Sequence, residues 1–276
     1  MHIDSNFLES LYQPLRVVVK DASEDIMEIY NKDSYELIEK SDGSPVTEAD
    51  NNANKIILDS LKKISPNISV VSEETYDKSS EIPKEPYWLI DPLDGTKEFI
   101  NKSNDFTVNI ALIENKVSIF GTICAPTSRQ IWQGSKFDDF DNANDIPETL
   151  RIIMSKSHQT EMDKEFLNHL KINHISFEII ERGSSLKLCA LSDNKADIYP
   201  RFGPTSEWDI AAGHAILSSN GGHICQILNK HSLDYSKDET ILNPAFAAFR
   251  NTSLKNYYLP LLLSLIHISE PTRLRR

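Results

Sequence analysis

Two carboxylates stand three positions apart at the end of an apolar segment. In the stretch WLIDPLDGTKEFI, Asp91 and Asp94 lie on either side of Pro92, and Gly95 follows directly. Proline fixes its own φ and glycine permits conformations closed to other residues, so the stretch predicts a stiff turn that aims both carboxylates into one space. Two acids this close repel one another unless a cation lies between them. Carboxylates, and a backbone carbonyl such as that of Leu93, are hard oxygen ligands that suit Mg²⁺.

Further acids occur where other apolar segments meet a turn or a helix start. Glu73 follows the segment ISVVS, and Asp209 begins the amphipathic segment DIAAGHAIL. A bridging Asp91 would share one ion with Glu73. It would share a second ion with Asp94 and Asp209. Two divalent ions about 3.5–4 Å apart are the usual arrangement for in-line phosphoryl displacement, so these acids predict a two-metal phosphoryl-transfer site.

Thr96 and Asp50 complete this hypothesis. The Thr96 hydroxyl, just past the predicted turn, would orient an attacking water whose proton Asp50 accepts. Each residue also has a structural explanation. Asp50 lies in the first turn of an expected helix, where a carboxylate complements the macrodipole, and Thr96 is placed to cap a helix. Glu73 with its neighbour Glu74 is, taken alone, typical of an exposed acidic turn.

The composition bounds the class of protein. The chain has 276 residues, 39% hydrophobic and 25% charged, which is ordinary for a globular protein. Its formal net charge of -12 argues against a nucleic-acid-binding surface, although a local metal can still attract an anionic substrate. Cys124, Cys189 and Cys225 form no disulfide or zinc pattern and predict a reducing cytoplasm. The N-terminus shows no signal peptide, and the apolar run 257–268 contains Pro260 and is too short to span a bilayer.

Hydrophobic periodicity predicts the elements that must position the acids, and they fall into two groups. The first group has two helices, two short strands and an antiparallel hairpin. The second alternates strands and helices, which favours layered α/β packing. An acid-rich loop, 137–148, separates the groups and is a candidate domain junction. The second helix opens with a capping box at residue 47 and ends just before Pro66. The other expected helices are 4–32, 160–171, 184–191 and 206–219. The expected strands are 68–71, 87–90, 106–112, 117–123, 150–154, 175–180, 196–199 and 223–228.

These groups predict two halves, residues 1–148 and 149–250, followed by a C-terminal tail, 251–276. The predicted fold class is α/β, a layered α+β sandwich with an N-terminal α+β half that carries most metal ligands and a smaller C-terminal α/β half. Because Asp209 comes from the second half, the site should lie in the crevice between the halves. The end of the tail, IHISEPTRLRR, resembles translated sequencing-adapter read-through, and the alternative is a genuine frayed terminus. Residues from about Ser264 onward therefore carry no fold prediction.

Four motifs, in this order, resemble the inositol-monophosphatase superfamily of Mg²⁺-dependent, lithium-sensitive phosphatases. They are DGSPVTEAD (42–50), SEE (72–74), DPLDGT (91–96) and WDIAAGHA (208–215). Within that superfamily, WLIDPLDGTKEFI, FTVNIALIE, GSSLKLC, YPRFGPTSEWD and ILNPAF are similar to bacterial 3'(2'),5'-bisphosphate nucleotidases of the CysQ type. The likeness runs from about residue 7 to residue 249.

The resemblance implies metal ligands and catalytic residues. Glu73, Asp91 and the Leu93 carbonyl would bind one of two or more Mg²⁺ ions. Asp91, Asp94 and Asp209 would bind a second. The implied catalytic residues are Asp50, Glu73 and Thr96.

The resemblance also implies a substrate site. The Gly95-Thr96 backbone would lie against the scissile phosphate, and residues of the second half would hold the rest of a nucleotide. Two of these have structural alternatives, because a lone His158 is more often a core histidine and Lys187 is also typical of a solvated helix face. The implied substrate contacts are Glu73, Leu93, Asp94, Gly95, Thr96, His158, Ser184, Ser185, Lys187 and Asp209.

The activity implied by the resemblance is Mg²⁺-dependent hydrolysis of the 3'-phosphate of adenosine 3',5'-bisphosphate, giving AMP and phosphate in sulfur assimilation and nucleotide recycling. A nucleic-acid polymer is not an expected partner, and the sequence predicts no oligomeric state. The expected location is the cytoplasm. Bacterial members imply peripheral association with the cytoplasmic face of the inner membrane, although no segment is typical of an anchor.

Three alternatives stay open at this stage. An inositol or sugar phosphatase of the same superfamily would share every metal ligand. A haloacid-dehalogenase-type phosphatase also has an Asp-rich D-G-T turn, but its two acids stand two positions apart and one is the nucleophile. A non-catalytic, metal-dependent nucleotide-binding or membrane-peripheral regulator is the third, and the intact Asp50, Thr96 and Asp209 argue against it.

Overall fold

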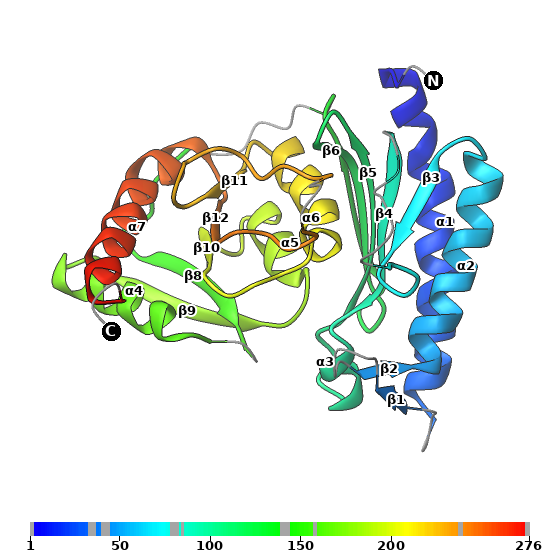
Figure 1. Ribbon diagram of the computed structural model, residues 1–276, viewed down its shortest axis with the longest axis horizontal. Helices are drawn as coiled ribbons and strands as arrows, with labels where there is room; N and C mark the ends of the chain where they lie inside the picture. The colour runs from blue at the N-terminus through cyan, green and yellow to red at the C-terminus, as the bar shows by residue number, and fades with distance from the viewer. Residues whose placement is uncertain are drawn as a thin grey trace.

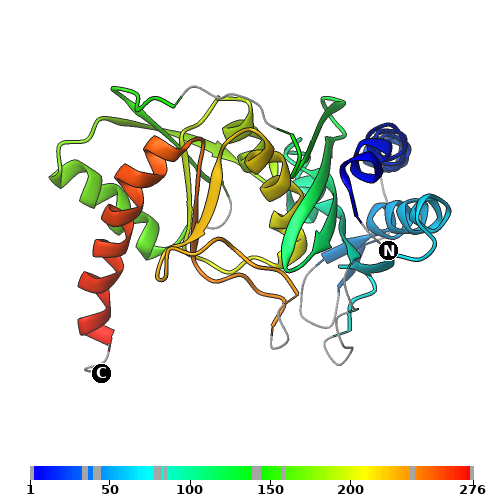
Figure 2. The ribbon, with the colours of Figure 1, turned by 90° about the horizontal axis from the view of Figure 1, so that it is seen from above.

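The chain folds into two five-stranded mixed sheets that alternate with layers of helices, as Figure 1 shows. The helical layers at the two outer edges lie at opposite ends of the molecule in both views (Figure 1 and Figure 2). This arrangement confirms the predicted α/β layered sandwich. The computed structural model describes residues 3–32, 37–39, 45–77, 83, 86–138, 144–156, 159–236 and 240–273, with the backbone alone at 37–39, 45 and 266–273.

The strand order of each sheet differs from the order along the chain. In the first sheet β3 pairs parallel to β4 and the other neighbours are antiparallel, with order β3 (Ser69–Ser72), β4 (Tyr87–Asp94), β5 (Thr107–Glu114), β6 (Val117–Ala125) and β7 (Gln130–Ser135). The order in the second sheet is β11 (His223–Gln226), β12 (Phe246–Phe249), β10 (Ile198–Arg201), β8 (Leu150–Ser155) and β9 (Phe177–Arg182). Strands β1 (Leu37–Glu39) and β2 (Pro45–Thr47) pair separately. The helices are α1 (Ser5–Tyr30), α2 (Glu48–Ile64), α3 (Thr96–Ile100), α4 (Glu161–Ile172), α5 (Leu186–Ser192), α6 (Glu207–Ser219) and α7 (Thr252–Arg273).

Helices cover both faces of each sheet. Helices α1 and α2 cover the outer face of the first sheet, α5 and α6 lie between the sheets, and α4 and α7 cover the outer face of the second. In β5, Val108 and Ile110 pack towards α1 and α2, whereas Ala111 and Ile113 pack towards α6. A strand buried on both faces needs apolar residues at almost every position, which explains the sequence TVNIALIE.

Helix α6 contacts both halves of the chain. It follows strands of the second sheet in sequence, yet it packs directly on β6 of the first. At Gly121 of β6 an added Cβ would stand 2.1 Å from the Ala212 carbonyl oxygen, so only glycine allows the helix this close. Gly134 of β7 meets Ser219 in the same way, at 2.2 Å from its Oγ. The two glycines seat the helix that carries Asp209 against the sheet that carries Asp91.

The D-P-L-D motif is the end of strand β4, which corrects the predicted turn. Strand β4 pairs with β5 at Asp91 and again at Asp94, and the register shifts between these positions. Pro92 lacks the N–H that a regular ladder requires, and such an irregularity tolerates it. The chain turns at Gly95, whose φ of 94° is left-handed. A Cβ added at this position would stand 2.9 Å from the Asp105 carbonyl oxygen, so the turn requires glycine.

The predicted helices of the first half and the hairpin β5–β6 are confirmed, but four strands were missed. Strands β1 and β2 are too short for a periodic pattern, and β7 is polar and partly exposed. Strand β12 has the short sequence FAAF, which shows no alternation. In the predicted loop 137–148, the described ends contain neither helix nor strand, and 139–143 lie outside the described residues.

The segment expected as a tail, 251–276, contains helix α7. Leu254, Tyr258, Leu262 and Leu265 of this helix are buried against the second sheet, because they recur with helical spacing on one face. The origin of the last residues as sequencing read-through stays a prediction. Within the described parts of the chain, no helix combines the length and the apolar character that crossing a membrane requires.

We expect Gly121→Ala to destabilise the protein by about 1–3 kcal/mol or more, because a methyl group there overlaps the backbone of α6. Thermal denaturation of the metal-free protein measures this. Gly203→Ala is the matched control, since its Cβ would meet its nearest neighbour at 3.5 Å, an ordinary contact. Equal melting midpoints for the two variants would contradict the close seating of α6.

Candidate active site

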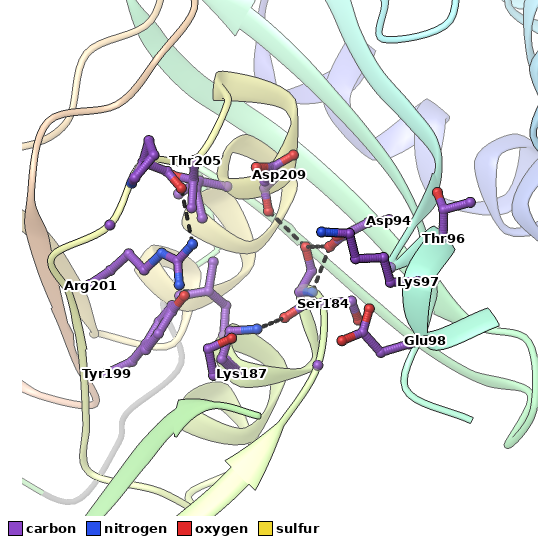
Figure 3. Close-up of a pocket in the computed structure, with 18 of the residues that line it drawn as sticks. Asp94, Thr96, Lys97, Glu98, Ser184, Lys187, Tyr199, Arg201, Thr205 and Asp209 are labelled. Atoms are coloured by element: carbon purple, nitrogen blue, oxygen red, sulfur yellow. Dashed lines mark hydrogen bonds between the residues drawn. The ribbon is translucent and has the colours of Figure 1, made fainter. Parts of the chain in front are cut away.

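A cavity of about 600 Å³ opens between the two halves. Its first wall comes from the ends of β3 and β4 and from α3, and its second from α5, β10 and the start of α6 (Figure 3). The predicted crevice between the halves is therefore present. Among the sequence-predicted site residues, those that line it are Glu73, Asp94, Gly95, Thr96, Ser184, Ser185, Lys187 and Asp209.

Three of the predicted metal ligands meet in space. Each of Glu73, Asp91 and Asp209 offers a carboxylate oxygen, and the three oxygens lie within 4.8 Å of one another. Three different elements deliver these side chains. Glu73 follows β3, where its backbone N–H donates to the Ile90 carbonyl oxygen at 3.1 Å, Asp91 lies in β4, and Asp209 occupies the first turn of α6. The convergence of distant acids expected from the sequence is thus seen in the fold.

Burial and the charges of neighbouring acids oppose the ionised forms of Asp91 and Asp209. Burial, then the charges of Glu73, Asp94 and Asp209, raise the pKa of Asp91 well above its ordinary value. Burial, then Asp94 and Glu73, likewise raise the pKa of Asp209 well above its ordinary range. Such a set of hard oxygen donors, repelling one another in a buried place, fits a divalent cation.

Asp94 lies beside this cluster and is not one of its three members. Burial raises its pKa, while Lys187 and the hydrogen bonds from Ser185 and Asn109 lower it. Its Oδ2 accepts bonds from the Ser185 N–H at 2.7 Å and from the Ser185 hydroxyl at 2.8 Å. The side chain is therefore held at the edge of the acidic cluster by the second half of the protein. Leu93, the remaining predicted ligand, is buried next to it with its carbonyl oxygen 3.3 Å from the Thr96 hydroxyl.

Asp50 and Thr96 form the predicted pair. The Thr96 hydroxyl donates to Asp50 Oδ1 at 3.1 Å. The other oxygen, Oδ2, accepts bonds from the backbone N–H and the hydroxyl of Thr47, at 2.7 and 2.6 Å, as the reciprocal partner in the capping box of α2. The capping explanation and the catalytic one thus apply to different oxygens of the same carboxylate.

The second wall of the cavity also carries two cationic side chains, Lys187 and Arg201. Lys187 is only 7% exposed, so it does not lie on a solvated helix face. Its Nζ donates to the Ser184 carbonyl oxygen at 2.5 Å and lies 5.5 Å from the centre of the Tyr199 ring. Burial lowers its pKa to about 8, although Asp94 acts in the opposite direction. Figure 3 shows Lys187, Tyr199 and Arg201 together on this side.

Arg201 is a site residue that the sequence reasoning missed. It lines the cavity from the end of β10, and its Nη2 donates to the Pro204 carbonyl oxygen at 3.0 Å. The signal that would have found it is its place in the motif YPRFGPTSEWD, eight positions before Asp209. Glu98 and Thr160 also line the cavity and were not predicted. His158 lies outside the described residues.

The layered fold and the acidic cluster define the class of metal-dependent phosphatases. The model of the inositol monophosphatase family matches residues 8–262. This chain belongs to that family.

Individual relatives and solved structures of this family are also similar to this chain. A protein of Escherichia coli (strain K12) named 3'(2'),5'-bisphosphate nucleotidase CysQ is 37% identical over 240 residues, which cover 83% of this chain and 95% of the relative. Its namesake from Buchnera aphidicola is 37% identical over 257 residues, covering 88% and 95%. The crystal structure of CysQ from Bacteroides thetaiotaomicron matches with a TM-score of 0.74 and 32% identity over 88% of this chain and 98% of that one. The Thermotoga maritima IMPase TM1415, at 18% identity, a TM-score of 0.73 and coverage of 92% and 97%, shows the shared fold.

We expect a divalent metal to raise the melting midpoint, because an ion that binds only the folded state stabilises it by about 2.7 kcal/mol at a hundred times its Kd. Asp209→Asn should melt higher than the wild type in EDTA, because it removes one of the repelling charges. The same variant should gain less from added Mg²⁺. Thermal denaturation with EDTA and with Mg²⁺ measures both differences. An equal response of both proteins to Mg²⁺ would exclude Asp209 as a ligand.

Proposed function

We propose that this protein is a Mg²⁺-dependent phosphatase that hydrolyses the 3'-phosphate of adenosine 3',5'-bisphosphate to give AMP and phosphate. The observation that carries the proposal is the composition of one cavity, which is lined both by acids that could hold metal and by the cations Lys187 and Arg201. A substrate with two separate phosphate groups matches this pattern. The printed names of the relatives, which are 37% identical, support the same substrate.

Two groups of ligands would hold the metal. Glu73, Asp91 and the Leu93 carbonyl suit one Mg²⁺, and Asp91, Asp94 and Asp209 suit a second. Bound Mg²⁺ supplies Lewis-acid polarisation of the phosphoryl oxygens and neutralises charge in the transition state. By holding the metal, the acids would place the scissile phosphate beside the Gly95-Thr96 backbone.

Thr96 and Asp50 move the proton of the attacking water. Because the Thr96 hydroxyl donates to Asp50, its lone pairs are left to accept a hydrogen bond from water. As the water oxygen attacks phosphorus and the bond to the 3'-oxygen breaks, a water proton passes to Thr96 and the Thr96 proton passes to Asp50. Only Oδ1 of Asp50 serves as the acceptor, since Thr47 occupies Oδ2. The leaving 3'-oxygen takes a proton from solvent.

In this proposal Arg201 and Lys187 bind the second phosphate. Arg201 offers a planar fork of donors that matches phosphate oxygens, and Lys187 adds a compact charge. Ser184 lines the same part of the cavity and completes the set. A contact from His158, which the family resemblance implies, stays a prediction.

The cysteines bear on the cellular setting. Cys124, Cys189 and Cys225 are free and buried, which fits a reducing compartment. By family resemblance we assign the reaction to the cytoplasm, to sulfur assimilation and nucleotide recycling, with sensitivity to lithium. Peripheral association with the inner membrane stays a prediction from the same resemblance.

A substrate panel tests the proposed specificity. We expect kcat/KM with Mg²⁺ to be higher for adenosine 3',5'-bisphosphate than for 3'-AMP or inositol 1-phosphate. Arg201→Met and Lys187→Met should each raise KM for the bisphosphate about tenfold or more, because a hydrogen bond to a charged group contributes about 1.5–3 kcal/mol. KM for 3'-AMP, which lacks the second phosphate, should stay nearly constant. Inositol 1-phosphate as the best substrate would favour the inositol phosphatase alternative.

Asp50→Asn tests the proton acceptor. The amide oxygen can still accept the Thr47 bonds and cap α2, but the side chain can no longer take a proton. We expect kcat to fall about 100-fold or more, with the melting midpoint close to that of the wild type. Steady-state kinetics and thermal denaturation measure the two effects. A kcat within a few-fold of wild type would remove Asp50 from the reaction.

A further inference from the structure

Asp94 has one carboxylate oxygen that protein donors occupy completely. Its Oδ2 accepts from the Ser185 N–H at 2.7 Å, from the Ser185 hydroxyl at 2.8 Å and from Asn109 Nδ2 at 3.3 Å. Ser185 is 3% exposed and Asn109 is 1% exposed, so these bonds lie away from solvent. Only Oδ1 of Asp94 is left for a metal ion, and the bonds to Oδ2 decide where Oδ1 points.

Ser185 also touches the element that carries the other ligand. Its hydroxyl oxygen lies 2.7 Å from the Asp209 carbonyl oxygen and accepts a bond from Asn109 Nδ2 at 2.9 Å. The hydroxyl has one proton, which it donates either to Asp94 or to the Asp209 carbonyl or shares between them. The backbone N–H of Ser185 donates to Asp94 in every case. Three elements from the two halves therefore meet at this one side chain: β4, β5 and α6.

We propose that Ser185, oriented by Asn109, is a positioning residue that sets the separation between Asp94 and Asp209 for metal binding. The inference rests on the proposed metal site and deepens it. Groups that bond the ligands of a metal orient them, and losing such a group typically weakens metal binding about 10–100-fold. The Asn109 amide supports this role on both sides, because its Nδ2 serves Asp94 and Ser185 together.

This role differs from the substrate contact that the family resemblance implies for Ser185. A substrate contact would change KM and leave the affinity for metal alone unaltered. The bonds to Asp94, Asn109 and the Asp209 carbonyl already engage the Ser185 hydroxyl within the protein. Ser184, its neighbour in the sequence, also lines the cavity.

Mn²⁺ alone, without substrate, is the probe for the experiment. Isothermal titration of Ser185→Ala should show metal binding at least about tenfold weaker than in the wild type. Ser118→Ala is the matched control. It also loses a buried hydroxyl that donates to a carbonyl of α6, that of Ala211 at 2.7 Å, but it touches no proposed ligand. Its affinity for Mn²⁺ should stay within about twofold of wild type, because removing a distant bond does not reorient a ligand.

Each outcome decides the inference. Ser185→Ala with wild-type affinity for Mn²⁺, or an equal loss in Ser118→Ala, would overturn it. A wild type that binds no Mn²⁺ would overturn the proposed function as well, so the two failures are distinguishable. The melting midpoint in EDTA shows whether each variant is folded. If Ser185→Ala is unfolded, Asn109→Ala decides, since it removes a bond to the same Asp94 oxygen and should also weaken Mn²⁺ binding.

Discussion

The repulsion among clustered carboxylates is the constraint on which the rest of this structure depends. Three carboxylate oxygens lie within 4.8 Å of one another, and ionised groups this close repel one another unless a positive charge compensates. Isolated acids in this position would take up protons, as the raised pKa values of Asp91 and Asp209 indicate. The arrangement becomes useful at neutral pH only when a cation shares the charge, which is the physical basis of a metal-dependent family.

Holding repelling groups together requires a rigid frame, and helix α6 provides most of it. The helix packs between the sheets, with the first sheet approaching at Gly121 and Gly134. Ser118 on β6 adds a hydrogen bond to the Ala211 carbonyl. Because the first turn of this helix carries Asp209, its seating on the first sheet brings that carboxylate to Asp91. The fold thus brings acids from both halves of the chain to one place.

The same hydrogen-bonding arrangement recurs at three of the acids. In Asp50, Asp94 and Asp209, one carboxylate oxygen accepts a backbone N–H, from Thr47, Ser185 and Ser206 respectively. A carboxylate fixed by a backbone donor loses little further freedom when its other oxygen binds a ligand or a proton. Structural and functional explanations of such acids therefore do not compete, since each explains a different oxygen of one side chain.

Much of the site could be predicted from the sequence, because its acids stand at recognisable local positions. Glu73 and Asp91 follow or end apolar strands, Asp50 sits in a capping box, and the motifs occur in the order of the family. Local pattern did not reveal that β4 continues through Pro92, that β7 and β12 exist, or that Lys187 is buried, since each depends on what packs against it. Arg201 and the bonds of Ser185 depend on the same kind of contact. Ser185 and Asp94 are 91 positions apart, and no periodicity or spacing relates them. The sequence by itself determined which acids the chain carries and where many of the local elements lie. Only the tertiary structure decided that Asp94 presents one oxygen to the cavity, because a distant donor, Ser185, occupies the other.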